Sequence, residues 1–188
     1  MNKAQLRQQA IADRNSIPEP VYHQFSRSIC EHFFTGFDLN FIHTIHVFLP
    51  VTERREPDLW PLIDRLRREF PGTRIAVPRM AGEQLESFYF EGLHQLEKNK
   101  FGIQEPKQGV TVESEKIDLV LVPLLLADKS GNRLGYGKGY YDRFLKTCRK
   151  DCIRAGVSLQ EPVDFIPAEP HDEKLTHLIT AGGVIRFK

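Results

Sequence analysis

The residues best suited to chemistry lie in one short run, residues 133–143, which reads Arg-Leu-Gly-Tyr-Gly-Lys-Gly-Tyr-Tyr-Asp-Arg. Glycine adopts backbone angles that other residues avoid and lets main-chain N–H groups approach a ligand closely. Flanked by Arg133, Lys138 and Arg143, such a loop is suited to hold an anion, above all a polyphosphate. Asp142 follows the last glycine by three residues, where its carboxylate could hold a magnesium ion against the phosphates. The glycines alone also fit a flexible hairpin with solvated charges.

The segments on either side of this run favour a binding loop. Residues 117–127, IDLVLVPLLLA, form a short apolar run typical of a strand buried on both faces. Residues 128–132 form a cluster of turn-forming residues. Over residues 140–150, apolar side chains recur at spacings of three and four, which predicts a helix. A buried strand, a glycine loop and a helix start in this order are the arrangement in which open α/β sheets bind ligands.

The run matches neither of the two common nucleotide motifs. A Walker A loop has Ser or Thr after its Gly-Lys pair, whereas Lys138 is followed by Gly139. A dinucleotide fingerprint reads G-x-G-x-x-G and follows the first strand of its fold. Here the spacing is G-x-G-x-G, and the motif lies two thirds of the way along the chain.

The whole phrase resembles that of the 5-formyltetrahydrofolate cyclo-ligase family, whose central pattern is close to R-L-G-x-G-x-G-Y-Y-D-R. Further segments similar to the family follow its order: the pair Lys3 and Arg7, Glu56 after a predicted strand, FGIQEP at 101–106 and PHD at 170–172. The resemblance extends over nearly the full length.

Two departures lie beside the glycine run. The chain reads Leu-Ala-Asp at 126–128, where the family usually has phenylalanine before the aspartate, and three leucines follow Pro123. These changes affect packing near the loop, and therefore the shape of the pocket rather than the type of reaction.

The resemblance implies an ATP- and Mg²⁺-dependent cyclisation of 5-formyltetrahydrofolate to 5,10-methenyltetrahydrofolate, with release of ADP and phosphate. The implied ATP-binding residues are Lys3, Arg7, Arg133, Leu134, Gly135, Tyr136, Gly137, Lys138, Gly139, Tyr140 and Tyr141. The implied folate-binding residues are Arg7, Glu56, Tyr136, Gly137, Lys138, Gly139 and Tyr140. The implied metal ligands are Asp142 and Asp172. Glu53 competes with Glu56 for the folate contact, because the surrounding segment is rich in charge and proline.

Several of these residues also have purely structural interpretations. Lys3 and Arg7 lie one helical turn apart and would suit a solvated helix face. Asp142 could cap a helix or favour its N-terminal dipole, and Asp172 could be a turn residue. Of the adjacent Tyr140 and Tyr141, we expect one to point into the core.

Two other classes of function share such a scaffold. A non-catalytic folate- or nucleotide-binding protein would keep the glycine loop but lose the basic pair or the aspartate pair, and both pairs are present. A sugar-phosphate isomerase or acyl-CoA transferase would need no ATP and would place a carboxylate in an apolar site. The residues therefore favour the cyclo-ligase interpretation.

Composition fits an intracellular enzyme. Lys plus Arg is 26 and Asp plus Glu is 25, so no bulk basic field points to nucleic acid. The three cysteines make an odd count without zinc-like spacing, and we expect reduced thiols. No apolar run approaches the ~20 residues that span a membrane, and the N-terminus has no signal-peptide core. We expect a cytoplasmic monomer that binds neither membranes nor nucleic acid.

The 188 residues predict one domain, residues 1–188. Helices are expected at 2–13, 20–34, 59–70 and 140–150. Strands are expected at 43–49, 74–77 (ended by Pro78), 85–90, 117–122, 156–159, 178–180 and 184–187. Strands that alternate with helices predict an α/β fold, a Rossmann-like, mainly parallel sheet with helices on both faces.

Overall fold

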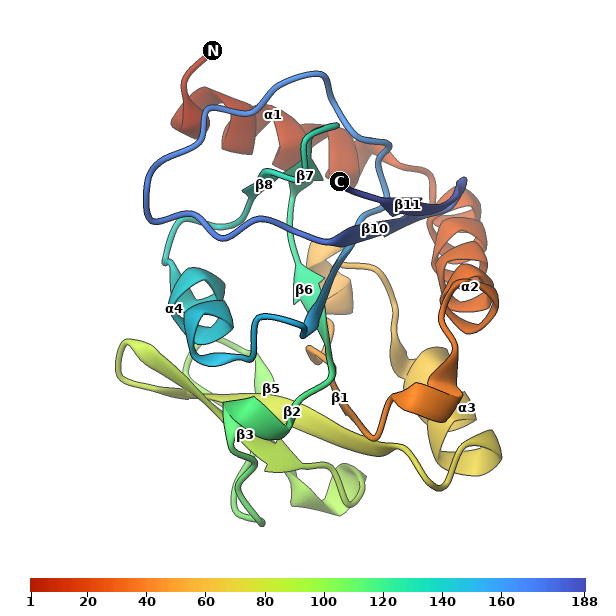
Figure 1. Ribbon diagram of the computed structural model, residues 1–188. Helices are drawn as coiled ribbons and strands as arrows, with labels where there is room; N and C mark the ends of the chain where they lie inside the picture. Colours follow the sequence, from red (N-terminus) through yellow and green to blue (C-terminus); the bar gives the residue numbers. More distant parts are fainter.

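A seven-stranded sheet runs through the computed structural model, which describes residues 1–188 (Figure 1). Its strand order is β11-β10-β9-β6-β1-β2-β3. Strands β10, β9, β6, β1 and β2 pair in parallel, and the edge strands β11 and β3 are antiparallel to their neighbours. The strand bounds are β1 Thr44–His46, β2 Arg74–Ala81, β3 Gln84–Tyr89, β6 Leu119–Pro123, β9 Ile153–Val157, β10 His177–Thr180 and β11 Gly183–Arg186. The predicted mainly parallel α/β fold is confirmed.

Four α-helices and two small sheets complete the fold. The helices are α1 Lys3–Ser16, α2 Glu19–Gly36, α3 Trp60–Glu69 and α4 Tyr140–Thr147. Short 3-10 helices lie at Leu39–Phe41, Thr52–Arg54, Leu93–Gln95 and Ser114–Lys116. The two-stranded sheets pair β4 Leu96–Lys98 with β5 Gln104–Pro106, and β7 Leu126–Ala127 with β8 Arg133–Leu134. None of the helices combines the length and the apolar character needed to span a membrane.

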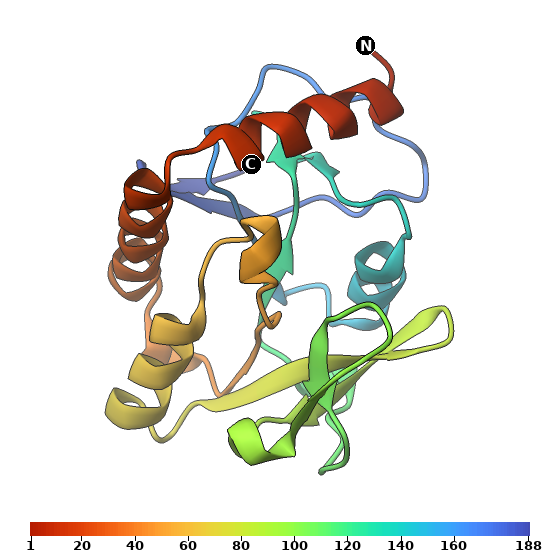
Figure 2. The same cartoon turned by 180° about the vertical axis from the view of Figure 1, so that it is seen from behind.

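Strand β6 shows why helices cover both faces of the sheet. Its side chains alternate between faces: Leu119 and Leu121 pack into the core formed with α2 and α3. Val120 and Val122 pack into the core formed with α4. Because both faces are apolar, each must be covered, and Figures 1 and 2 show α2 and α3 on one side and α4 on the other.

Helix α1 lies over the hairpin of β7 and β8 rather than against the central sheet. In both views it lies beside the long loop that follows β9 (Figures 1 and 2). A small core joins these parts, with Ala10 of α1 packed among Leu126, Leu134 and Ile166. A capping box between Asn2 and Gln5 fixes the first turn of the helix. The N-terminus is thereby brought beside the glycine run.

Several predicted boundaries were wrong: the strand expected at 43–49 spans only Thr44–His46, the one expected at 156–159 is Ile153–Val157, and the helix expected at 140–150 ends at Thr147. Strand β2 does not end at Pro78 but continues to Ala81. Its parallel partner β1 ends opposite Ala76, so Pro78 needs no N–H toward that side. Beyond that point β2 pairs only with the antiparallel β3, where Pro78 lies opposite Ser87, whose carbonyl accepts from Val112 instead.

Candidate active site

The glycine loop, residues 135–139, connects β8 to α4. Gly137 and Gly139 have φ angles of 90° and 68°, in the left-handed region that favours glycine. Gly139 is the N-cap of α4. A Cβ on Gly137 would also lie 3.2 Å from the Cζ atom of Arg7, whose Nε donates to the Gly135 carbonyl at 2.9 Å. The loop therefore needs glycine both for its backbone and for the close approach of α1.

A charged cavity of about 390 Å³ opens on one side of this loop. Its lining contains no hydrophobic residue and comes from α1, the loop, α4 and the segment 169–172. The lining residues are Lys3, Arg7, Gly137, Lys138, Gly139, Asp142, Arg143, Lys146, Glu169, His171 and Asp172. Residues that the sequence predicts as phosphate and metal ligands, from three distant parts of the chain, thus meet at one surface.

Lys3 reaches across this cavity to the late acidic segment. Its Nζ lies 2.7 Å from Asp172 and 2.5 Å from Glu169. Burial is the largest single effect and opposes ionisation of Asp172, but the hydrogen bonds from Lys3 and the Glu169 amide and the charge of Lys3 together lower the pKa of the carboxyl below its ordinary value. Asp172 also accepts from the Glu169 amide at 2.8 Å, so it closes a turn as well as facing the cavity.

Asp142 is held on its other side by Arg133. The guanidinium of Arg133 donates to Asp142 at 2.6 Å and also to the Glu173 carbonyl. Asp142 further accepts from the Glu173 amide at 3.0 Å. No side chain caps α4, so Asp142 is not its cap, but Asp142 lies in the first turn, where a carboxylate favours the helix dipole. Asp142 also ties the start of α4 to the loop before β10.

Six residues predicted to bind ATP lie outside the cavity lining: Arg133, Leu134, Gly135, Tyr136, Tyr140 and Tyr141. Arg133 is buried behind Asp142, and Leu134 lies in the small core beneath α1. Tyr141 packs against His46 and Phe144 in the interior, whereas Tyr140 donates from its hydroxyl to the Gly82 carbonyl at 2.9 Å. One tyrosine of the pair therefore points into the core, as expected.

A group of hydrogen-bonded polar side chains lies on the side of the loop that faces α1 and residues 51–56, called here the inner side; Glu56 is buried and Tyr136 is partly exposed. The Tyr136 hydroxyl donates to Glu56 Oε1 at 2.7 Å, and the Val51 amide donates to Glu56 Oε2 at 2.8 Å. Burial, followed by the charge of Glu56, raises the pKa of Tyr136 to about 12. Glu53 is exposed and faces Lys98 at 3.7 Å. Of the two candidate glutamates, Glu56 is the one in contact with the glycine loop.

The sequence analysis missed Arg14, the third residue of this hydrogen-bonded group. Its Nη2 donates to the Tyr136 hydroxyl at 2.6 Å, and the residue is 4% exposed. The available signal was its position seven residues after Arg7, which places both on one face of a helix. Without the fold, that spacing is indistinguishable from a solvated basic stripe.

The donor set at the cavity fits a magnesium ion. Carboxylate oxygens are the ligands that Mg²⁺ prefers, with water and phosphate oxygens completing the shell. Asp142 and Asp172 both line the cavity, and ligand atoms of Glu169, His171 and Asp172 lie within 4.8 Å of one another. In this structure each aspartate pairs with a cationic side chain.

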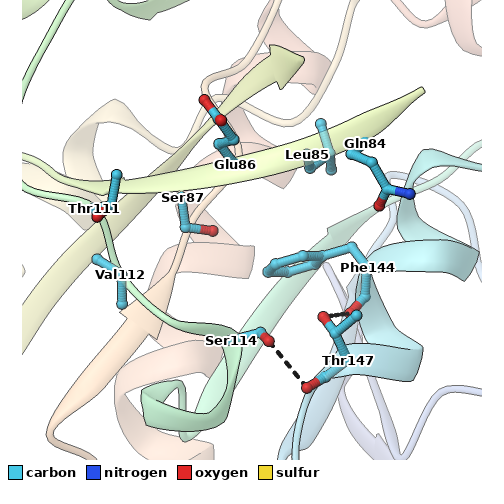
Figure 3. A pocket seen from close by; sticks show the side chains of 9 residues that line it. All are labelled: Gln84, Leu85, Glu86, Ser87, Thr111, Val112, Ser114, Phe144 and Thr147. Atoms are coloured by element: carbon cyan, nitrogen blue, oxygen red, sulfur yellow. Dashed lines mark hydrogen bonds between the residues drawn. The ribbon is translucent and has the colours of Figure 1, made fainter. Parts of the chain in front are cut away.

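A second cavity, of about 300 Å³, lies between β3, residues 111–114 and α4. Figure 3 shows Ser87, Ser114 and Thr147 around the ring of Phe144. Its lining is mostly neutral, and it includes none of the residues that the sequence predicts to bind ATP, folate or metal. This second cavity therefore carries none of the chemistry that the sequence predicts.

Comparison with known proteins decides the family. The model of the 5-formyltetrahydrofolate cyclo-ligase family matches residues 1–181. This chain belongs to that family. The cyclo-ligase of Mycolicibacterium smegmatis is 34% identical over 190 residues, which cover 95% of this chain and 93% of that protein. A probable cyclo-ligase of Schizosaccharomyces pombe is 34% identical over 146 residues, covering 66% of this chain and 69% of that protein.

A solved structure extends the cyclo-ligase likeness to the fold. The 5,10-methenyltetrahydrofolate synthetase of Aquifex aeolicus superposes with a TM-score of 0.84 at 26% identity, covering 100% of this chain and 94% of that one. The resemblance drawn from the glycine run is therefore confirmed at the level of family and fold. The roles of individual residues remain predictions.

Proposed function

We propose that this protein cyclises 5-formyltetrahydrofolate to 5,10-methenyltetrahydrofolate, with hydrolysis of ATP to ADP and phosphate. The observation that supports it is the meeting of two unlike surfaces at one loop. A cavity rich in charged groups lies on one side, and the pair of Glu56 and Tyr136 lies on the other. The first suits a polyphosphate, and the second suits a polar ring.

The chemistry explains why ATP is needed. The formyl oxygen of the substrate is amide-like and a poor leaving group. Transfer of the γ-phosphoryl group forms a bond from phosphorus to that oxygen, breaks the bond to the bridging oxygen, and releases ADP. The N10 amine then attacks the formyl carbon and loses its proton, and the carbon–oxygen bond breaks as phosphate departs. Phosphoryl transfer of this kind depends mainly on positioning and on neutralising charge.

The cavity residues divide this work between them. Lys3, Arg7 and Lys138 bind phosphate oxygens, and exposed loop amides add further donors. Asp142 and Asp172 hold Mg²⁺, which when bound supplies positive charge beside the phosphates. Arg133 lies within 2.6 Å of Asp142, so it orients that carboxylate as well as adding positive charge near the site.

The folate lies on the inner side of the loop. Glu56 offers a buried carboxylate to the N–H groups of the ring, with Tyr136 beside it. Arg7 lines the cavity and donates to the Gly135 carbonyl, so it lies beside the loop that separates the two ligands. This arrangement lets the loop hold ATP and folate together, so that the formyl oxygen can meet the γ-phosphate.

The alternative functions lack comparable support. A non-catalytic binder would not need Asp142 and Asp172 beside the basic groups in one cavity. An isomerase or transferase would need a carboxylate poised in an apolar site, whereas Glu56 is already hydrogen-bonded by an amide and a hydroxyl.

Spectroscopy tests the proposal directly. Purified protein is mixed with ATP, Mg²⁺ and 5-formyltetrahydrofolate, and the ultraviolet absorbance of methenyltetrahydrofolate is followed. We expect it to grow only when all three are present. Absorbance that does not grow, with protein shown to be folded by circular dichroism, would contradict the proposed activity.

A further inference from the structure

Arg14 is a buried cation whose donors are not all used. The residue is 4% exposed. Its Nη2 donates to the Tyr136 hydroxyl, but its Nε and Nη1 are buried and have no partner. A buried N–H without an acceptor is costly, and buried charged groups are normally satisfied. Two such donors on one guanidinium point to an acceptor that a ligand delivers.

The surroundings of Arg14 indicate what that ligand offers. The Tyr136 hydroxyl is bound on both sides: it donates to Glu56 and accepts from Arg14. The pair of Glu56 and Arg14 therefore presents an acceptor and a donor that one bridging group can join. A lone carboxylate would bind a donor edge only, whereas this pair is complementary to a donor and an acceptor side by side.

The ring of the proposed substrate carries that pattern. A 2-amino-4-oxo pterin places an N3–H donor next to a C4 carbonyl acceptor. We infer that Arg14 is a specificity-determining residue that donates to the C4 carbonyl of the folate ring while Glu56 accepts from N3–H. This inference rests on the proposed function, since it takes the substrate class from it.

In this structure the Tyr136 hydroxyl makes the bonds to Glu56 and Arg14 that the pterin ring would make when it binds. Tyr136 is 40% exposed, whereas Glu56 and Arg14 are 7% and 4% exposed. Tyr136 is thus the outermost member of this hydrogen-bonded group, and it lies between Gly135 and Gly137 in the loop. A carbonyl oxygen has two lone pairs and accepts from two N–H groups, so the ring also satisfies a donor of Arg14 that the phenol leaves free.

A matched pair of ligands tests this role. Folic acid and its 4-amino analogue, aminopterin, differ at the C4 substituent and at N3, which carries a hydrogen only in folic acid, and calorimetry gives the dissociation constant of each. We expect the wild-type protein to bind folic acid about 10- to 100-fold more tightly, because the 4-amino group faces Arg14 with a donor. In Arg14→Met the preference should fall by about threefold or more, with the remainder coming from the Glu56 contact to N3–H, and Arg14→Lys should restore part of the loss.

Two further variants separate recognition from folding. Arg68→Met makes the same replacement at an arginine whose side chain is 72% exposed, and it should keep the full preference. Arg14→Gln removes the charge and most of the donors but keeps one amide donor for the Tyr136 hydroxyl, so it replaces Arg14→Met if that variant does not fold, and its preference should also fall.

The outcomes are distinct. A wild-type protein that binds the two ligands equally, or binds neither, overturns the inference. So does an Arg14→Met or Arg14→Gln protein that weakens both ligands by the same factor, which is the result of a merely structural role. Failure of the wild-type protein to form methenyltetrahydrofolate would instead overturn the proposed function, whichever ligand Arg14 prefers.

Discussion

The two sides of the glycine loop differ in how their charges are held. On the cavity side, Lys3 forms an ion pair with Asp172, and their own side chains are 15% and 18% exposed. On the inner side, Glu56 and Arg14 are 7% and 4% exposed and share the Tyr136 hydroxyl. Ion pairs in contact with water exchange partners at small cost, whereas buried polar groups need a replacement for every bond they give up.

This difference suits the two sides to different ligands. On the cavity side, cations expected to bind phosphate are paired with the aspartates expected to bind Mg²⁺. Without ligand, these cations and aspartates neutralise one another. When ATP and Mg²⁺ bind, each cation gains a phosphate oxygen and each aspartate gains the metal ion as a new partner of opposite charge. On the inner side, a ligand can replace the Tyr136 hydroxyl only if it donates to Glu56 and accepts from Arg14, as that hydroxyl does. Affinity for ATP should therefore depend on salt, and affinity for the folate ring on its substituents.

Removal of Met1–Gln8 should have the largest effect on the cavity side. It deletes Lys3 and Arg7 but leaves Ala10 and Arg14 in place. We expect cyclisation to be abolished and the melting temperature without ligand to change little, since terminal turns contribute least to stability. Cleavage by trypsin near Arg14 should slow in the full-length protein when ATP and Mg²⁺ are added. A truncated protein with the full-length rate would show that the basic pair is only a solvated helix face.

Asp142→Asn should lower kcat by about 100-fold or more, because a neutral amide is a poor ligand for Mg²⁺. Asparagine keeps an acceptor for Arg133 and the Glu173 amide, so the fold should survive. Asp172→Asn should act in the same direction. Asp151→Asn, at a side chain that is 77% exposed, is the matched control. Near-normal turnover of Asp142→Asn at ordinary magnesium would remove this residue from the metal site.

Lys138→Ala should lower kcat/KM for ATP by about 10- to 1000-fold, the scale of one charge-assisted contact to a phosphate. The side chain is exposed in the loop, and its removal should leave stability unchanged. The KM for 5-formyltetrahydrofolate should stay near the wild-type value, and Lys116→Ala should alter neither constant. A rise in the folate KM alone would place Lys138 on the inner side of the loop.

The smallest expected effect concerns the interior under α4. His46 is fully buried without a partner for either ring nitrogen, and burial lowers the pKa of His46 to about 3. The unfolded chain binds this proton near pH 6.5, so the stability from keeping His46 neutral is present above that pH and is lost as pH falls. The slope is up to about 1.4 kcal/mol per pH unit.

Urea unfolding between pH 7 and 5 measures this slope. His46→Phe should flatten it, whereas His23→Phe, at a side chain that is 54% exposed, should not. Equal slopes in the wild-type protein and His46→Phe would mean that His46 takes up its proton in the folded protein, and that the interior beneath α4 is as open to water as the cavity.

Local patterns in the sequence predicted most of the fold. The alternation of helices and strands and the apolar run at 117–122 gave the parallel sheet and its central strand. The extent of β2 was missed because the effect of Pro78 depends on whether a neighbouring strand needs its N–H, which is a matter of tertiary pairing.

The site was predictable where a side chain acts through its own motif. Lys138 and Asp142 lie in the glycine run and reached the cavity as expected. Arg14 was missed because its role depends on Tyr136 and Glu56, which lie 122 residues and 42 residues further along the chain. The sequence predicts Arg133 as a phosphate ligand, but the fold buries its side chain and places it 2.6 Å from Asp142 of α4.

Coupling between the two sides of the loop is the central claim, and product stoichiometry tests it most directly. ADP and methenyltetrahydrofolate are measured in one reaction, with each substrate omitted in turn. The account predicts that both products form mole for mole, and that ATP is not hydrolysed without 5-formyltetrahydrofolate. ATP hydrolysis that proceeds at the same rate without the folate, or cyclisation without ATP, would contradict it.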